Sequence, residues 1–298
     1  MTLRNRFALI ITGIIIFAIA TPILVLYARG FIYDWHTGKI TKTGTLVVRT
    51  EPAKATVFLD DKQQKGTTPL NIRFLLPRDY EVRVEKENYQ TWTKRLTVRS
   101  QFVTWANDNR EALALFLTTP TLINTATIQP DVPITTTKQQ ILDLLKTFNI
   151  PPQEFTTGEI IRVQNQTYLI LDQTLYTLNG SLQKIYSPVI FTAFDQGSDK
   201  LLYANDNEVY LFNPQSQDSE LIFRNLTNLK EPEVNWSTGY IFFVSDNKLK
   251  AIELDSRGHR NLFDILALPE NFSSYSLSED GITLTLIAGD TSYKYKIQ

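Results

Sequence analysis

The segments FDQGSDKLLY (194–203), WSTGYIFF (236–243) and LSEDGITL (277–284) decide the fold of the second half of the chain. Each begins with an aromatic residue or leucine, continues through a polar turn that contains glycine, and ends in an apolar run. The copies begin at positions 194, 236 and 277, so they are spaced by 42 and 41 residues. A spacing of about 40 to 45 residues is typical of four-stranded propeller blades. We therefore predict β-propeller-like repeats over residues 158–298.

A second strand is predicted after each turn, at residues 208–212, 248–254 and 293–297, and an earlier copy covers residues 168–171 and 174–178. The repeats resemble those of TolB-like propellers, which implies three to four blades. Because the last copy stops after its second clear strand, its completion requires a strand from elsewhere, and the candidates are residues 121–128 and 159–163. The alternatives to closure by a strand of the same chain are an open β-array and closure with a second chain.

Every copy carries an aspartate in the turn between its paired strands, at Asp172, Asp206, Asp246 and Asp290. Equivalent turns of a propeller lie on one rim, so these four carboxylates are candidate ligands for a metal cation. Aspartate also suits tight hairpin turns for backbone reasons alone, and this explanation is the simpler one. We predict no cofactor.

Residues 44–118 consist of short runs in which apolar and polar residues alternate, separated by turn sequences. This period of two predicts a small antiparallel β-sandwich with one buried face per sheet. The expected strands are residues 45–49, 56–60, 70–74, 80–85, 93–98 and 112–117.

This sandwich region resembles the PEGA family in GTLVVRTEPAKATVFLDD (44–61) and KGTTPLNIRFLLPRDYEVRVEKENYQTW (65–92). The resemblance is carried by Gly44, Pro52, Ala55, Val57, Asp60, the turn 66–69, Leu76-Pro77, Tyr80, Val82, Val84 and Asn88-Tyr89. It implies a surface-associated β-module without enzymatic chemistry. The aromatic residues Tyr89, Trp92 and Trp105 are candidates for a carbohydrate-binding platform, although aromatic residues on strands more often belong to the core.

Residues 119–157 are rich in Thr and Pro and are predicted to link the two β-parts. Within them, residues 138–148 have an apolar face, which predicts a short helix. That face is formed by Ile141, Leu142, Leu145 and Phe148. We expect the helix to pack on a neighbouring domain.

The sequence FALIITGIIIFAIATPILVLY, from Phe7 to Tyr27, contains no charged side chain. As a helix it would measure about 31 Å, which matches a hydrocarbon core of about 30 Å. We therefore predict that residues 7–27 are a transmembrane helix in contact with the lipid bilayer. Arg4 and Arg6 place more positive charge before this helix than after it, so residues 1–6 are expected in the cytoplasm and residues 28–43 form a juxtamembrane segment outside it.

A cleaved signal peptide is the alternative, because Ala18-Ile19-Ala20 fits the small-x-small pattern of a cleavage site. The apolar run continues beyond that site to Tyr27, which favours an uncleaved anchor. Both interpretations place the rest of the chain outside the cytoplasm.

Charge is unevenly distributed, although the formal net charge is only −1. Residues 1–118 hold 17 basic and 10 acidic side chains, whereas residues 119–298 hold 13 basic and 21 acidic ones. The near-neutral total argues against nucleic-acid binding. The chain has no cysteine, which excludes disulfides and thiol chemistry and favours a bacterial or archaeal origin for an envelope protein.

Motifs of enzymatic chemistry are absent from the sequence. The spacing of the twelve glycines excludes G-x-G-x-x-G, G-x-S-x-G and the P-loop, and the two histidines, His36 and His259, lie in polar surroundings. We predict an all-β cell-envelope protein with one N-terminal transmembrane helix that binds protein or glycan and is not an enzyme. The alternative is an extracytoplasmic glycan hydrolase that uses two carboxylates of the distal part.

This topology predicts that protease added to intact spheroplasts removes residues 44–298, because the helix holds them on the outer side of the membrane. Immunoblotting against a C-terminal tag measures the loss. Survival of the tag in spheroplasts whose other external proteins are digested would contradict the predicted topology.

Overall fold

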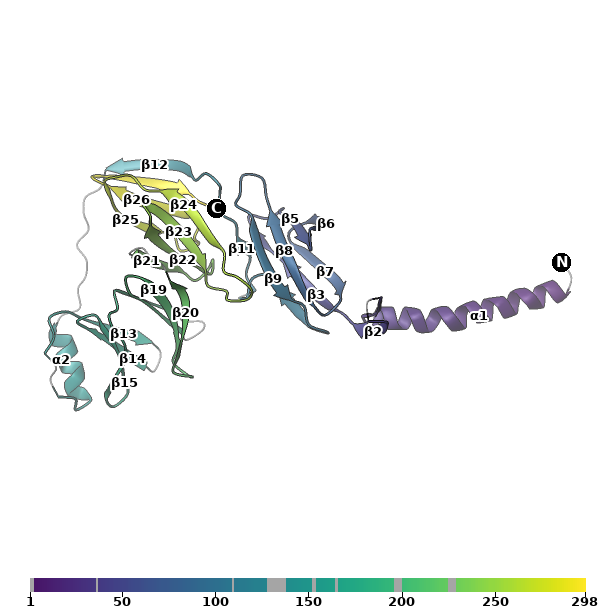
Figure 1. The fold of residues 1–298 in the computed structure, drawn as a ribbon, viewed down its shortest axis with the longest axis horizontal. Helices are drawn as coiled ribbons and strands as arrows, with labels where there is room; N and C mark the ends of the chain where they lie inside the picture. The colour runs from purple at the N-terminus through teal and green to yellow at the C-terminus, as the bar shows by residue number, and fades with distance from the viewer. Residues whose placement is uncertain are drawn as a thin grey trace. The chain divides into compact units, whose positions relative to one another are not determined.

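The computed structural model describes residues 3–35, 37–108, 110–127, 138–151, 154–163, 166–195, 200–224 and 229–298. Two compact units are present: residues 1–115 with 257–259, and residues 116–256 with 260–298. Apart from two helices, the regular elements in the described part are β-strands (Figure 1). The predicted all-β fold with one N-terminal apolar helix is confirmed.

Helix α1 (Leu3–Ala28) contains the predicted apolar segment and includes Pro22. Its stretch Ile10–Ala28 is long and apolar enough to cross a membrane, and none of that stretch is buried. Gly30 ends the helix: its φ of 79° is left-handed, and its N–H donates to the Tyr27 carbonyl at 2.9 Å. Near the end of the helix the Tyr27 ring stacks on that of Phe74, with 4.8 Å between the ring centres, but the apolar stretch as a whole stays unburied, so water is a poor solvent for it.

A hairpin not foreseen in the juxtamembrane segment follows, made of β1 (Phe31–Asp34) and β2 (Lys39–Lys42). Its exposed side chains include Tyr33, Trp35 and Ile40, and Trp35 is 86% exposed. Neither strand alternates between buried and exposed residues, so no period-two pattern predicts this hairpin.

The predicted sandwich is confirmed as three small sheets. Their orders are β6-β5-β8-β9, β10-β3-β7 and β11-β4. The strands are β3 (Gly44–Val48), β4 (Thr50–Glu51), β5 (Thr56–Leu59), β6 (Lys62–Thr67), β7 (Leu70–Leu75), β8 (Asp79–Glu85), β9 (Trp92–Thr97), β10 (Val103–Trp105) and β11 (Leu113–Ala114). Tyr80, Val82 and Val84 on β8 are buried while Glu81 is exposed, which is the one-sided burial that alternation predicts.

The expectation of a purely antiparallel sandwich is wrong at two places. Strand β10 pairs with β3 in parallel, and β11 pairs with β4 in parallel. Parallel partners cannot be joined by a tight hairpin, and here the strands from β4 to β9 lie between β3 and β10 in the chain. Alternation of apolar residues does not encode strand direction.

The repeat region contains four four-stranded antiparallel sheets, which we call blades 1 to 4. Blade 1 is β13 (Gly158–Val163), β14 (Gln166–Leu171), β15 (Thr174–Leu178) and β16 (Leu182–Tyr186). Blade 2 is β17 (Phe191–Asp195), β18 (Lys200–Ala204), β19 (Glu208–Asn213) and β20 (Asp218–Arg224). Blade 3 is β21 (Lys230–Asn235), β22 (Tyr240–Ser245), β23 (Lys248–Glu253) and β24 (Leu262–Ala267). The first strands of blades 2 to 4 contact one another in order.

Blade 4 takes its fourth strand from an earlier part of the chain (Figure 1). It consists of β25 (Phe272–Leu277), β26 (Thr283–Ala288), β27 (Thr291–Lys296) and β12 (Thr121–Thr127). Strand β12 pairs antiparallel with β27, from Thr121 opposite Lys296 to Thr127 opposite Thr291.

The first of the two predicted sources of a closing strand is thus confirmed, and the second forms β13 of blade 1. Assigning residues 121–127 to a linker was wrong. Without β12, the backbone N–H and C=O groups along the edge of β27 would lack a strand partner.

Helix α2 (Lys138–Thr147) covers one face of blade 1, as the apolar face of the predicted helix required. Its buried residues Ile141 and Leu145 pack with Leu169 and Leu171. Phe148, expected on the same face, follows the helix and is 39% exposed.

Successive blades stack face to face. On β18, Leu201 and Tyr203 belong to the core shared with blade 1, whereas Leu202 and Ala204 belong to the core shared with blade 3. Two of the residues that begin the repeats lie beside these cores: Phe194 packs against the core of blades 1 and 2, and Trp236 is half-buried against the core of blades 2 and 3. Since it is not fully buried, its truncation should cost less than the roughly 3 to 5 kcal/mol of a fully buried tryptophan.

The repeat turns of blades 3 and 4 bind each other directly. The Asn235 side-chain amide donates to the carbonyls of Ser278 (3.1 Å) and Glu279 (3.3 Å). Gly281 is left-handed at φ 69°, and a Cβ there would lie 2.4 Å from Cγ2 of Thr238. Gly239, the equivalent glycine of blade 3, is left-handed at φ 77° with no atom within 4 Å of such a Cβ.

Gly281→Ala is therefore expected to destabilise the chain more than Gly239→Ala. Both substitutions place a side chain in a left-handed conformation, at about 1 kcal/mol, but only the first forces an overlap, which adds roughly 1 to 3 kcal/mol. Urea unfolding of the full chain in detergent, followed by circular dichroism, measures the difference. Equal losses would show that blades 3 and 4 do not pack through this turn.

Candidate functional site

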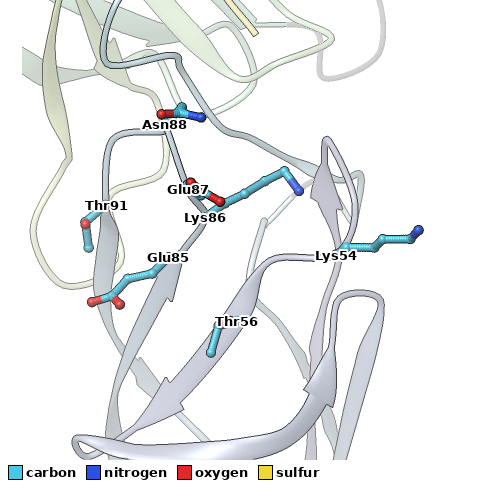
Figure 2. A pocket seen from close by; sticks show the side chains of 7 residues that line it. All are labelled: Lys54, Thr56, Glu85, Lys86, Glu87, Asn88 and Thr91. Carbon is cyan, nitrogen blue, oxygen red and sulfur yellow. The ribbon is translucent and has the colours of Figure 1, made fainter.

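A pocket of about 650 Å³ lies where β5 begins and β8 ends (Figure 2). Thr56 and Glu85 from these strands contribute to its wall, together with the turn that follows β8. The side chains of Lys54 and Lys86 extend to one side in Figure 2 and that of Glu85 to the other. The pocket is thus lined by polar groups of both charges.

Several of these groups already have partners inside the sandwich. Lys86 donates to the Ala53 carbonyl at 2.9 Å, and Glu85 pairs with Arg83. The lining residues hold two lysines and two glutamates, so their formal charges cancel. This arrangement offers hydrogen bonds to a polar ligand but neither an aromatic surface nor a nucleophile beside a base.

The predicted aromatic platform does not exist as a set of three. Trp92 is fully buried, because the alternation of β9 points it into the core with Leu96, so the prediction that it binds ligand is wrong. Tyr89 is half-buried, and the Lys86 ammonium lies 5.9 Å from its ring centre. Only Trp105 lines a pocket that the structure describes.

The Trp105 pocket has a volume of about 480 Å³ and lies wholly within the first unit. Trp105 is half-buried at the end of β10, and the Arg49 guanidinium lies 5.0 Å from its ring centre. Phe102 and Val103 extend the apolar surface, and both are exposed. A volume of several hundred Å³ with aromatic lining is typical of small-ligand sites.

The four candidate aspartates occupy equivalent turns, each between the second and third strands of its blade. Equivalent turns of radially repeated blades are expected on one rim, and this placement of the four carboxylates stays a prediction. Two of the carboxylates are engaged locally: Asp172 accepts the N–H groups of Thr156 and Thr157 at 2.9 Å, and Asp246 pairs with Lys250 at 2.7 Å.

A metal site at these turns is not formed. Among the residues that the structure describes, no three His, Cys, Asp or Glu side chains are grouped to hold a metal ion. The turn geometry explains two of the aspartates, because Asp172 and Asp246 adopt positive φ angles of 44° and 53°. These are values that aspartate tolerates better than most residues.

Two further carboxyl groups have shifted pKa values that no sequence motif indicated. Glu231 and Glu233 lie on β21, and Tyr275 of β25 donates its hydroxyl to the Glu231 carbonyl at 2.5 Å. The Leu277 N–H donates to the Glu233 carboxylate at 3.2 Å. Burial raises the pKa of both glutamates above the usual value. Burial, together with these two negative charges, also raises the pKa of Tyr275 well above its usual value.

Comparison with known proteins adds a family for the first unit. Residues 43–111 match the PEGA domain family, which confirms the resemblance of the sandwich. No curated protein sequence matches the chain.

Solved structures resemble the chain only distantly. The extracellular domain of BT4673 from Bacteroides thetaiotaomicron is 11% identical with a TM-score of 0.38, over 90% of this chain and 31% of that one. A quinonprotein alcohol dehydrogenase-like protein from the same organism is 9% identical with a TM-score of 0.34, over 82% and 64%. A luciferin-regenerating enzyme is 8% identical with a TM-score of 0.35, over 46% and 57%. The chain thus spans less than two thirds of each of these proteins.

Glu233→Gln should stabilise the chain at neutral pH. A carboxyl whose pKa is raised on folding binds its proton more tightly in the folded state, so its contribution to stability falls as pH rises above about 4.5. Glutamine keeps the acceptor for Leu277 without the charge. Thermal unfolding should show a higher midpoint for the variant at pH 7.5 and no difference below pH 4. Exposed Glu270→Gln is the control, and an equal gain there would contradict the role of burial.

Proposed function

We propose that this chain is a membrane-anchored protein of the cell envelope whose two β-rich units serve as binding or scaffold modules outside the cytoplasm. The observation that carries the proposal is the stretch Ile10–Ala28, which is apolar, long enough to span a bilayer and entirely unburied. The PEGA match directly after it supports an extracellular β-module.

The orientation that we propose has the N-terminus in the cytoplasm. Arg4 and Arg6 precede the apolar stretch and only Arg29 follows closely, so the positive-inside rule favours this direction. The apolar run past Ala20 supports retention of the helix as an anchor rather than cleavage.

A non-enzymatic role is proposed for the β-units. The two pockets of the first unit are lined by side chains suited to hydrogen bonding, ion pairing and stacking. His259 is exposed, as expected for a surface residue, and His36 lies outside the described residues.

Glycan hydrolysis remains the second candidate, and one observation favours it. Glu231 and Glu233 are two carboxyl groups on one strand with raised pKa values, and glycosidases use such a group as their general acid. Loss of glycan cleavage in both Glu231→Gln and Glu233→Gln, with folding intact, would establish this function. Wild-type protein that cleaves no envelope glycan would reject it.

The anchor predicts that the full chain stays with membranes through alkaline carbonate extraction. Ile14→Lys with Ile16→Lys should release it, because each lysine at the centre of a span costs about 3 kcal/mol. Ile40→Lys with Val103→Lys adds the same charge at exposed positions beyond the helix and should leave the chain bound. Soluble wild-type protein would show that the segment is cleaved.

A further inference from the structure

The pocket beside Trp105 is lined by exposed apolar side chains and by positive charge. Neither is needed for packing of the sandwich core. Phe102 is 66% exposed and Val103 is 53% exposed, although both adjoin a well-packed sandwich. Apolar and aromatic side chains that line a concavity are the kind of surface that ligand pockets use. Thr104 between them is held by a hydrogen bond to the Thr97 carbonyl at 3.0 Å.

Positive charge dominates the same pocket. Its charged lining residues are four arginines and one acid, namely Arg95, Arg99, Arg110, Arg257 and Asp108. The single acid is already paired, because Arg257 of the same unit lies 3.4 Å from its carboxylate. Arg95 lies 3.5 Å from Asp79, outside the pocket.

Arg99 and Arg110 are the charges left for a ligand. Both are exposed, and within the described part of the chain neither has an ion-pair partner. A guanidinium matches the geometry of a carboxylate or a phosphate and binds either through two parallel hydrogen bonds. An exposed aromatic ring beside it offers an apolar face to the carbon-bound hydrogens of a sugar.

We propose that the Trp105 pocket binds an anionic saccharide, a sugar polymer that carries carboxylate or phosphate groups. The inference rests on the proposed binding function and specifies its ligand. Arg99 and Arg110 hold the acidic groups, while Phe102 and Trp105 stack against the sugar rings. A neutral glycan would contact only the aromatic side chains of the pocket. A small inorganic anion would contact only its arginines.

Binding can be measured by microscale thermophoresis of the full chain in uncharged detergent. The probes are oligogalacturonate, the same oligomer with its carboxylates methyl-esterified, and phosphomannan, a mannose polymer that carries phosphate groups. Oligogalacturonate or phosphomannan should bind, and comparing their affinities distinguishes a carboxylate-bearing sugar from a phosphate-bearing one. The methyl ester should bind at least tenfold more weakly than its parent, and affinity should fall as salt rises.

Matched variants locate the site. Arg99→Ala with Arg110→Ala should weaken binding at least tenfold, and Phe102→Ala, which removes an exposed ring without loosening the core, should weaken it severalfold. Arg73→Ala, an exposed arginine outside the pocket, should leave binding unchanged.

Three results would overturn the proposal: no binding of either anionic polymer, equally tight binding of the methyl-esterified oligomer, or equal weakening by Arg73→Ala. None of them would reject the anchored binding module itself. That broader proposal fails if the wild-type chain is soluble after carbonate extraction.

Discussion

The second unit depends on the burial of both faces of its blades. All six residues of β22, from Tyr240 to Ser245, are buried, and so are four consecutive residues of β18. Neither face of such a strand is exposed to water, so a blade needs a packing partner on each side. Phe116 shows how such a face is covered on blade 3, because its ring makes edge contacts with Tyr240 and Phe242.

This constraint also explains the place of α2. Blade 1 has a face turned away from blade 2, and its apolar residues Leu169 and Leu171 would otherwise lie in water. The helix is short, but Ile141 and Leu145 are spaced one turn apart and reach the same strip of the sheet. The chain between β12 and β13 therefore supplies packing as well as a connection.

The sequence predicted the blades because their turns leave a local mark. Gly239 and Gly281 occupy left-handed turns, and a fixed spacing between such turns is visible without a structure. Strand β12 could be predicted only as one of two candidates for the closing strand, since all seven of its residues are exposed and its role depends on pairing with β27.

In the candidate site, too, some features have a local sequence pattern and others depend on the tertiary fold. Trp92 and Trp105 are the same residue type in one sandwich, but the register of β9 buries the first, while the second lies at the end of β10 and lines a pocket. Composition could not distinguish them. The pKa values of half-buried Glu233 and of exposed Glu231 are raised by partial desolvation in the folded chain, which no local pattern encodes.

The pairing of β12 with β27 has a consequence for the order in which the molecule is made. Ser292 donates to the Ala126 carbonyl across 166 positions of sequence. Contacts so distant in the chain form slowly, since the intervening loop must first lose its freedom. During synthesis β12 leaves the ribosome long before its partner exists, so blade 4 is the last to be completed. Until then β12 is an unpaired strand whose backbone N–H and C=O groups are open to pairing with another chain.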